Sequence, residues 1–344
     1  MSAPTEVAAP PRPGLLDRAW TWLTGSAHAT RGLAVTRVVL GLIVWSQLVA
    51  NWSDRHYTWG DGASWADPVR SVRSWPGFLS MFQQADGLLF DALYLLAIVA
   101  GLLLMVGAWT RASALLTLFL WMSLYVANPF VGSGGDAILR MVLLYACLTD
   151  SGRHLSVDAW LRRRRGAVRP FLPSWLGNTI HNVAVVLIVH QVLVVYVASA
   201  LWKVQSPRWL DGTATYYPLQ VEAYSPWVDL IHPFSSAAPI ILVATWAAIG
   251  VQLMFPVLLL YRATRAIGLV LVTGMHLGIG IFMGIMYFSL VMIAVDMMLV
   301  SDGTWRRGGD LVRGWWRRRT GDADDDAPTA RSAHDRKPQQ TQGM

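Results

Sequence analysis

The side chains best suited to chemistry lie at the end of one long apolar segment. Lys203 closes the stretch Tyr196-Val-Ala-Ser-Ala-Leu-Trp-Lys203, shortly before Pro207. In a helix, Tyr196, Ser199 and Lys203 occupy positions i, i+3 and i+7 and share one face. Desolvation there would disfavour the charged ammonium, so Lys203 could act as a general base or a nucleophile. The alternative is a lysine whose stem carries its charge out to the lipid headgroups.

Two histidines and one carboxylate lie inside other apolar segments. His276, in Thr-Gly-Met-His-Leu-Gly, could bond a polar ligand or shuttle a proton, and could equally be a satisfied core histidine. His190 is expected to line the interior, whereas His181 is expected near the cytoplasmic end, and their spacing fits no metal motif. Asp296 is the only carboxylate well inside the last apolar segment, and the sequence does not identify its partner.

Asp136 and Arg140 stand four residues apart at the start of another apolar segment. They can pair on one helix face, which lowers the cost of bringing both charges into a membrane. We therefore expect a structural ion pair, the alternative being an Arg140 that binds an anion or orients a substrate. The sequence shows no metal-ligand cluster, phosphate-binding glycine loop or Ser/His/Asp motif, so no metal is expected.

The composition indicates an integral membrane protein. Of 344 residues, 54% are hydrophobic and 14% are charged, whereas a soluble domain has roughly 25% charged residues. The apolar residues form blocks such as Leu33–Ala50, Leu88–Val106 and Ile240–Leu260. Each block approaches the ~20 residues that a helix needs to cross the hydrocarbon core. We predict an all-α, multi-pass bundle that does not fold as a soluble domain, with the lipid bilayer as its surroundings.

We expect about eight transmembrane helices. They lie at about 33–50, 88–106, 112–127, 136–149, 180–202, 239–260, 266–283 and 286–300. The fourth is short, and the last two are separated only by Gly284 and its neighbours, so they could form one bent hairpin. The predicted organisation is a cytoplasmic segment over 1–30, a transmembrane domain over 31–305, and a basic, then disordered cytoplasmic tail over 306–344.

Arginine supplies the formal net charge of +7, because the chain has only the lysines Lys203 and Lys337. The arginines gather at both termini and in alternate connections, whereas the connections 51–87 and 204–238 mix a few arginines with carboxylates. The positive-inside rule therefore places both termini in the cytoplasm and these two connections outside the cell membrane. We interpret the positive surplus as a topology signal, and expect no nucleic-acid partner.

Several stretches resemble known membrane families. Three regions resemble the vitamin K-dependent γ-carboxylase family. The first is Tyr196-Val-Ala-Ser-Ala-Leu-Trp-Lys203 with Trp209-Leu-Asp-Gly212 and Tyr216-Tyr217, and the second is Thr149-Asp-Ser-Gly-Arg-His-Leu-Ser-Val-Asp158. The third is Thr264-Arg-Ala-Ile-Gly268 with His276 and Ile281-Phe-Met-Gly-Ile-Met286. Asn128-Pro129 and Gly135-Asp136 with Arg140 resemble the bacterial horizontally transferred transmembrane (HTTM) proteins, which include the membrane component of a sporulation-delaying toxin system. The shared order of these stretches over about 130–300 carries the resemblance.

The resemblance implies that Lys203 corresponds to the lysine that deprotonates reduced vitamin K, and His276 to a histidine of the same site. It implies an oxidoreductase or epoxidase that uses an isoprenoid quinol such as menaquinol. The residues expected to contact the substrate are Tyr196, Ser199, Trp209, Arg140 and His190, of which Arg140 and His190 have no assigned counterpart in the carboxylase. The carboxylase has a large lumenal region where this chain has a short charged tail, so carboxylation of tethered glutamates is not expected. The alternative is a non-enzymatic membrane partner that helps mature or export a small secreted peptide.

Overall fold

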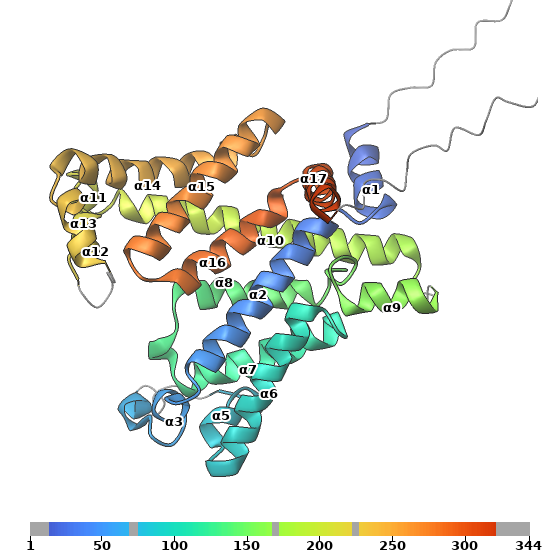
Figure 1. The fold of residues 1–344 in the computed structure, drawn as a ribbon, viewed down its shortest axis with the longest axis horizontal. Helices are drawn as coiled ribbons and strands as arrows, with labels where there is room; N and C mark the ends of the chain where they lie inside the picture. The colour runs from blue at the N-terminus through green and yellow to red at the C-terminus, as the bar shows by residue number, and fades with distance from the viewer. Residues whose placement is uncertain (1–13, 69–74, 167–171, 222–226, 321–344) are drawn as a thin grey trace, which may run out of the picture. The chain divides into compact units, whose positions relative to one another are not determined.

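The computed structural model describes residues 14–68, 75–166, 172–221 and 227–320, which fold into helices joined by turns (Figure 1). No β-strand occurs in these ranges, so the predicted all-α class is confirmed. The disordered tail predicted after about residue 320 lies outside the described residues. Residues up to Asp302 form one compact unit, and a second unit begins at Gly303.

Long apolar helices dominate the first unit. They are α2 (Thr30–Ala50), α6 (Gly87–Val106), α7 (Thr110–Ala127), α10 (Ser174–Lys203), α14 (Ala238–Leu258) and α15 (Arg262–Phe282). Each has at least 18 residues and is apolar enough to cross a membrane. The described part of the chain thus contains six candidate spans, or up to seven if Met286–Leu299 and Asp302–Arg319 together form a broken one. A polytopic helical membrane protein is therefore confirmed.

Two of the eight predicted spans form short helices. They are α8 (Gly134–Ala146) with 13 residues and α16 (Met286–Asp296) with 11, the latter extended by η4 (Met297–Leu299). At 1.5 Å per residue, α8 is about 20 Å long, which is less than the hydrocarbon thickness of ~30 Å. Neither helix is long enough to cross a membrane alone. α15 and α16 pack against each other as the predicted hairpin.

Shorter helices occupy the connections. They are α3 (Arg55–Thr58), η1 (Ser64–Ala66), η2 (Gly77–Leu79), α5 (Met81–Gln84), η3 (Pro129–Val131), α9 (Val157–Arg165), α11 (Pro207–Leu210), α12 (Tyr216–Leu219) and α13 (Val228–Ser235). In addition, α1 (Leu15–Gly25) precedes α2, and the 19-residue α17 (Asp302–Thr320) follows η4. The sequence did not predict α1. A buried amide holds its end, because Asn182 Nδ2 on α10 donates to the carbonyl oxygens of Trp22, Leu23 and Ser26.

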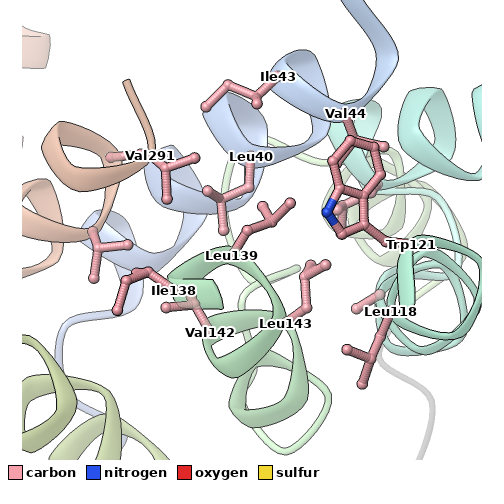
Figure 2. Close-up of a cluster of buried hydrophobic side chains, with 14 of the residues drawn as sticks. Leu40, Ile43, Val44, Leu118, Trp121, Ile138, Leu139, Val142, Leu143 and Val291 are labelled. Atoms are coloured by element: carbon pink, nitrogen blue, oxygen red, sulfur yellow. The ribbon is translucent and has the colours of Figure 1, made fainter. Parts of the chain in front are cut away.

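The apolar core explains how the short α8 is accommodated. Figure 2 shows α8 among side chains of α2, α7 and α16. The labelled residues are Leu40, Ile43 and Val44 of α2, Leu118 and Trp121 of α7, Ile138, Leu139, Val142 and Leu143 of α8, and Val291 of α16. All of them are buried. One face of α8 packs against these three helices, so α8 does not need to reach both membrane surfaces to bury the apolar side chains of that face.

Glycine permits the closest helix contact of the core. A Cβ atom added to Gly41 of α2 would lie 2.6 Å from the Cα of Met105 on α6, and one added to Gly101 of α6 would lie 3.0 Å from the backbone nitrogen of Trp45. Small residues let helix backbones approach closely in membranes, where dispersion contacts replace the hydrophobic effect as the force between helices. The pairing of α2 and α6 therefore depends on Gly41.

We expect Gly41→Ala to destabilise the bundle, because its methyl group would meet the α6 backbone, which cannot rotate away. Overpacking of this kind costs about 1–3 kcal/mol in protein cores. The measurement is the temperature at which half of the protein in detergent is no longer monodisperse. The control is Gly274→Ala in α15, where an added Cβ meets no atom within 4 Å. A Gly41→Ala variant as stable as the Gly274→Ala variant would show that α2 and α6 do not need this close approach.

A buried arginine caps the C-terminal end of α6. Arg37 of α2 is 3% exposed. Its guanidinium donates to the carbonyl oxygens of Leu104 and Met105, in the last turn of α6, and to those of Ser151 and Leu155 in the α8–α9 connection. The last four carbonyls of a helix have no partner within the helix, and a cation there also interacts favourably with the helix dipole. Arg37 therefore joins α2, α6 and this connection.

Candidate functional site

Lys203 is the last residue of α10, and its side chain turns back along the helix. Nζ donates to Ser199 Oγ one turn earlier, at 2.7 Å, and to Gln252 Oε1 on α14, at 2.6 Å. Side chains in a helix lean toward its N-terminus, which brings the Lys203 amine beside Ser199. A lysine extended toward the headgroups would make neither bond. The half-buried amine therefore lies against two helices of the bundle.

The surroundings of Lys203 suit both of its protonation states. A neutral amine has two N–H groups, for which Ser199 and Gln252 supply the acceptors, and it keeps one lone pair. An ammonium has a third N–H, and Nζ lies 5.1 Å from the ring centroid of Trp209, within cation–π range. Within the described ranges, no carboxylate forms an ion pair with Lys203. A general base needs a site that tolerates both states.

The loop that carries Trp209 is fixed to α14. Trp209 belongs to α11, which directly follows α10. Farther along this loop, Thr215 Oγ1 lies 2.8 Å from Thr245 Oγ1 and donates to the carbonyl oxygen of Ile241 at 3.2 Å. Both of these partners are on α14, which also provides Gln252. One helix thus positions an acceptor for the Lys203 amine and anchors the loop that places an aromatic ring beside it.

A second polar cluster lies two turns earlier on α10. Tyr196 Oη donates to Asp296 Oδ2 on α16 at 2.6 Å and lies 3.0 Å from His276 Nε2 on α15. Tyr196 and His276 are 1% exposed, and Asp296 is 0% exposed. The partner of Asp296 that the sequence leaves open is therefore Tyr196. Three helices meet at this Tyr196–His276–Asp296 cluster.

The cluster has two complementary hydrogen-bond arrangements. In one, an ionised Asp296 accepts the Tyr196 hydroxyl proton, and His276 donates its Nε2–H to the Tyr196 oxygen. In the other, a protonated Asp296 donates to Tyr196, Tyr196 donates to His276 Nε2, and Nδ1 carries the ring proton. His276 Nδ1 and Asp296 Oδ1 are buried without a protein partner in the described structure. A proton taken up at Nδ1 converts the first arrangement into the second, so the cluster can store one proton.

The expected ion pair between Asp136 and Arg140 is wrong. Asp136 Oδ2 accepts from the backbone N–H of Ser133 at 2.5 Å, in a capping box at the start of α8. The Arg140 guanidinium instead lies 3.8 Å from the ring centroid of Tyr125. No ion pair between Asp136 and Arg140 occurs among the described residues. A carboxylate three residues after an N-cap serine satisfies a free backbone N–H, and this local bond takes Asp136 away from Arg140.

We expected His190 to line the interior, but the structure shows that it is exposed. The neighbouring buried positions of α10 are Ile188 and Val192. His190 is two residues from each, about 200° around the helix, and therefore on the opposite face. His181 is buried, accepts from the backbone N–H of Asp150 at 2.9 Å through Nδ1 and bonds the carbonyl oxygen of His28 at 2.8 Å through Nε2.

Gln252 is the site residue that sequence reasoning missed. It is 7% exposed and contacts Lys203 across 49 positions of the chain. Its signal was present, because it is the one amide within the apolar stretch of α14. A buried polar side chain in a membrane span is itself a candidate for function. The other predicted residues that the structure brings to Lys203 are Ser199 and Trp209.

A small cavity lies between α2, α7 and α8. It has a volume of about 20 Å³, and its polar lining includes Gln47, Asn128 and Asp136. That volume suits about one water molecule. Tyr125 also lines it. Arg140 thus stacks on a residue that lines this cavity.

The region of the chain that matches a known protein family includes the whole candidate site. The family described as HTTM domain matches residues 27–305 of the chain. A protein of Bacillus subtilis (strain 168), described as "Uncharacterized protein YitO", is 25% identical over 211 residues, which are 59% of this chain and 65% of that protein. The chain thus covers less than two thirds of the length of this relative. No solved structure matches the chain.

Proposed function

Because the chain belongs to the HTTM domain family, as its motifs predicted, we propose that it is a membrane enzyme that binds an isoprenoid quinol and deprotonates it with Lys203. One observation carries the proposal. The Lys203 amine is held by two neutral acceptors and an aromatic ring, and no carboxylate is paired with it in the described residues. This arrangement leaves a lone pair for a proton when the amine is neutral, and a partner for the third N–H when it is not.

The surroundings of Lys203 fit an amphipathic quinol. The half-buried indole of Trp209 offers a flat surface for the ring, and the Lys203 amine lies 5.1 Å from the centroid of that indole. Helix α14, which provides Gln252, and helix α15 expose large apolar side chains such as Val243 and Val270. A prenyl tail could therefore remain in the bilayer while the quinol head reaches Lys203. Menaquinol is the member of this class that we expect.

The proposed step is a single proton transfer. The O–H bond of the quinol breaks, its electron pair stays on oxygen, and the proton forms an N–H bond with the Lys203 lone pair. Ser199 and Gln252 keep their hydrogen bonds throughout, so no side chain has to rearrange. The ammonium then releases the proton to water, because the hydrogen bonds described for Nζ lead to Ser199 and Gln252 and not to the Tyr196–His276–Asp296 cluster. Loss of that proton returns Lys203 to its neutral form.

The test is to purify the protein in mild detergent and identify its bound lipid by mass spectrometry. We expect an isoprenoid quinone in near-stoichiometric amount. Trp209→Ala should lower its recovery at least about ten-fold, because the ring beside Lys203 is lost and one aromatic contact is worth about 0.5–1.5 kcal/mol beyond its burial. Trp202→Ala is the matched control, since Trp202 is 73% exposed at the end of α10, next to Lys203 in the chain. Recovery of a small peptide without any quinone would favour the non-enzymatic alternative instead.

A further inference from the structure

The second unit begins with a helix, α17, whose two sides differ sharply in chemistry. Positions are 100° apart around an α-helix. Trp305, Val312 and Trp316 therefore lie along one line at i, i+7 and i+11, with Leu311 and Trp315 flanking them. Leu311, Val312, Trp315 and Trp316 are between 49% and 71% exposed. The apolar side of α17 is thus not buried within its own unit.

Arginines cover the other side of α17. They are Arg306, Arg307, Arg313, Arg317 and Arg318, whereas Arg319, in the last turn, lies on the apolar side. The acidic residues of the helix are Asp302, which accepts from the backbone of Thr30 and Arg31, and Asp310, which pairs with Arg313 at 2.6 Å. Arg319 also stacks on Trp315 at 5.0 Å. With six arginines and two aspartates, the helix has a net charge of +4.

The chain itself keeps α17 close to a bilayer. Only Val300 and Ser301 separate it from η4, which continues α16 in the membrane domain. Two residues span at most about 7 Å. A helix with Trp and Leu on one side and arginine on the other lies in the plane of a membrane surface, and basic clusters directly beside a membrane span attract anionic lipid.

We propose that α17 is an interfacial helix that binds the anionic phospholipid headgroups of the bilayer in which the protein resides. Its tryptophans and aliphatic side chains enter the boundary between headgroups and acyl chains. Its arginines bond the phosphates above them, and guanidinium groups match phosphate oxygens in paired geometry. This inference does not depend on the proposed enzyme activity, because it concerns different residues and a different ligand.

Spin labels on the full-length protein in nanodiscs test the proposal. The chain offers a matched pair of glycines, Gly308 in the middle of the apolar side and Gly314 among the arginines, and an added Cβ meets no atom within 4 Å at either. Each would be replaced by cysteine in a Cys147→Ala background and labelled. The measurement compares collisions of the label with oxygen, which concentrates in lipid, and with a water-soluble nickel complex.

In nanodiscs that contain phosphatidylglycerol, we expect the label at 308 to be in lipid and the label at 314 in water. In nanodiscs of phosphatidylcholine alone, the difference between the two labels in their collisions with oxygen and nickel should shrink. In the anionic discs, 0.5 M salt should reduce this contrast between the labels. Combined Arg306→Gln, Arg313→Gln and Arg317→Gln should need at least about three-fold more anionic lipid for the same contrast. Equal water access at both labels in anionic discs would overturn the proposal. So would a contrast that ignores charge and salt, or one that appears only when another protein or a nucleic acid is added.

Discussion

Lys203→Arg should abolish quinol consumption while leaving the protein folded. A guanidinium keeps the positive charge and can still donate to Ser199 and Gln252, but it does not give up its proton at accessible pH. Loss of a positioned general base typically costs 10²–10⁴-fold in rate. The measurement is the rate at which purified protein and dioxygen consume menaquinol, because a quinolate gives up electrons to oxygen more readily than the neutral quinol does.

Two further variants should be measured beside Lys203→Arg. Lys203→Met should be equally inactive, and Lys337→Arg, which changes the other lysine of the chain, should keep the full rate. All three should elute as monodisperse protein. A Lys203→Arg variant with the wild-type rate would exclude the general-base role and favour a purely electrostatic one.

Arg37→Ala should be the most destabilising single change in the transmembrane domain. It removes the donor for four backbone carbonyls, those of Leu104, Met105, Ser151 and Leu155. Each buried acceptor left unsatisfied costs about 1–3 kcal/mol, against a total stability of ~5–15 kcal/mol. We expect the unfolding midpoint in detergent to fall by about 10 °C or more, or folded protein to be lost altogether.

Arg163→Ala on α9 is the matched control for Arg37, because that side chain is exposed and surface charges contribute little. Arg37→Lys should recover only part of the stability, since one ammonium cannot reach four carbonyls as the planar guanidinium does. Arg37→Ala and Arg163→Ala variants with equal midpoints would show that Arg37 does not hold α2, α6 and the α8–α9 connection together.

Helical periodicity explains which site residues could be predicted. Tyr196, Ser199 and Lys203 lie on one face because their spacing requires it, and the structure bonds Lys203 to Ser199 as neighbours on that face. The apolar blocks likewise predicted the long helices, since length and hydropathy are properties of a single segment. Their number was less certain, because α8 and α16 are apolar but too short to cross a membrane alone.

The remaining parts of the site depend on how helices meet. Tyr196 and Asp296 are 100 positions apart, so spacing along one helix could not predict their hydrogen bond. The Asp136–Arg140 prediction failed for the opposite reason, because a closer backbone N–H competed for the carboxylate. No sequence pattern singled out Arg37, which lies inside the first predicted span, and only the fold shows that it is buried among carbonyl oxygens.

The most direct test of quinol deprotonation by Lys203 uses the rarity of lysine in this chain. The chain contains two lysines, Lys203 and Lys337, so ¹⁵Nζ-lysine labelling of a Lys337→Arg variant leaves a single side-chain signal. Under anaerobic conditions, adding menaquinol to the purified protein should move this signal from the position of a neutral amine to that of an ammonium. Oxidised menaquinone, which has no hydroxyl proton to give, should leave it in place. An ammonium signal that is the same without ligand, with quinone and with quinol would contradict a lysine base.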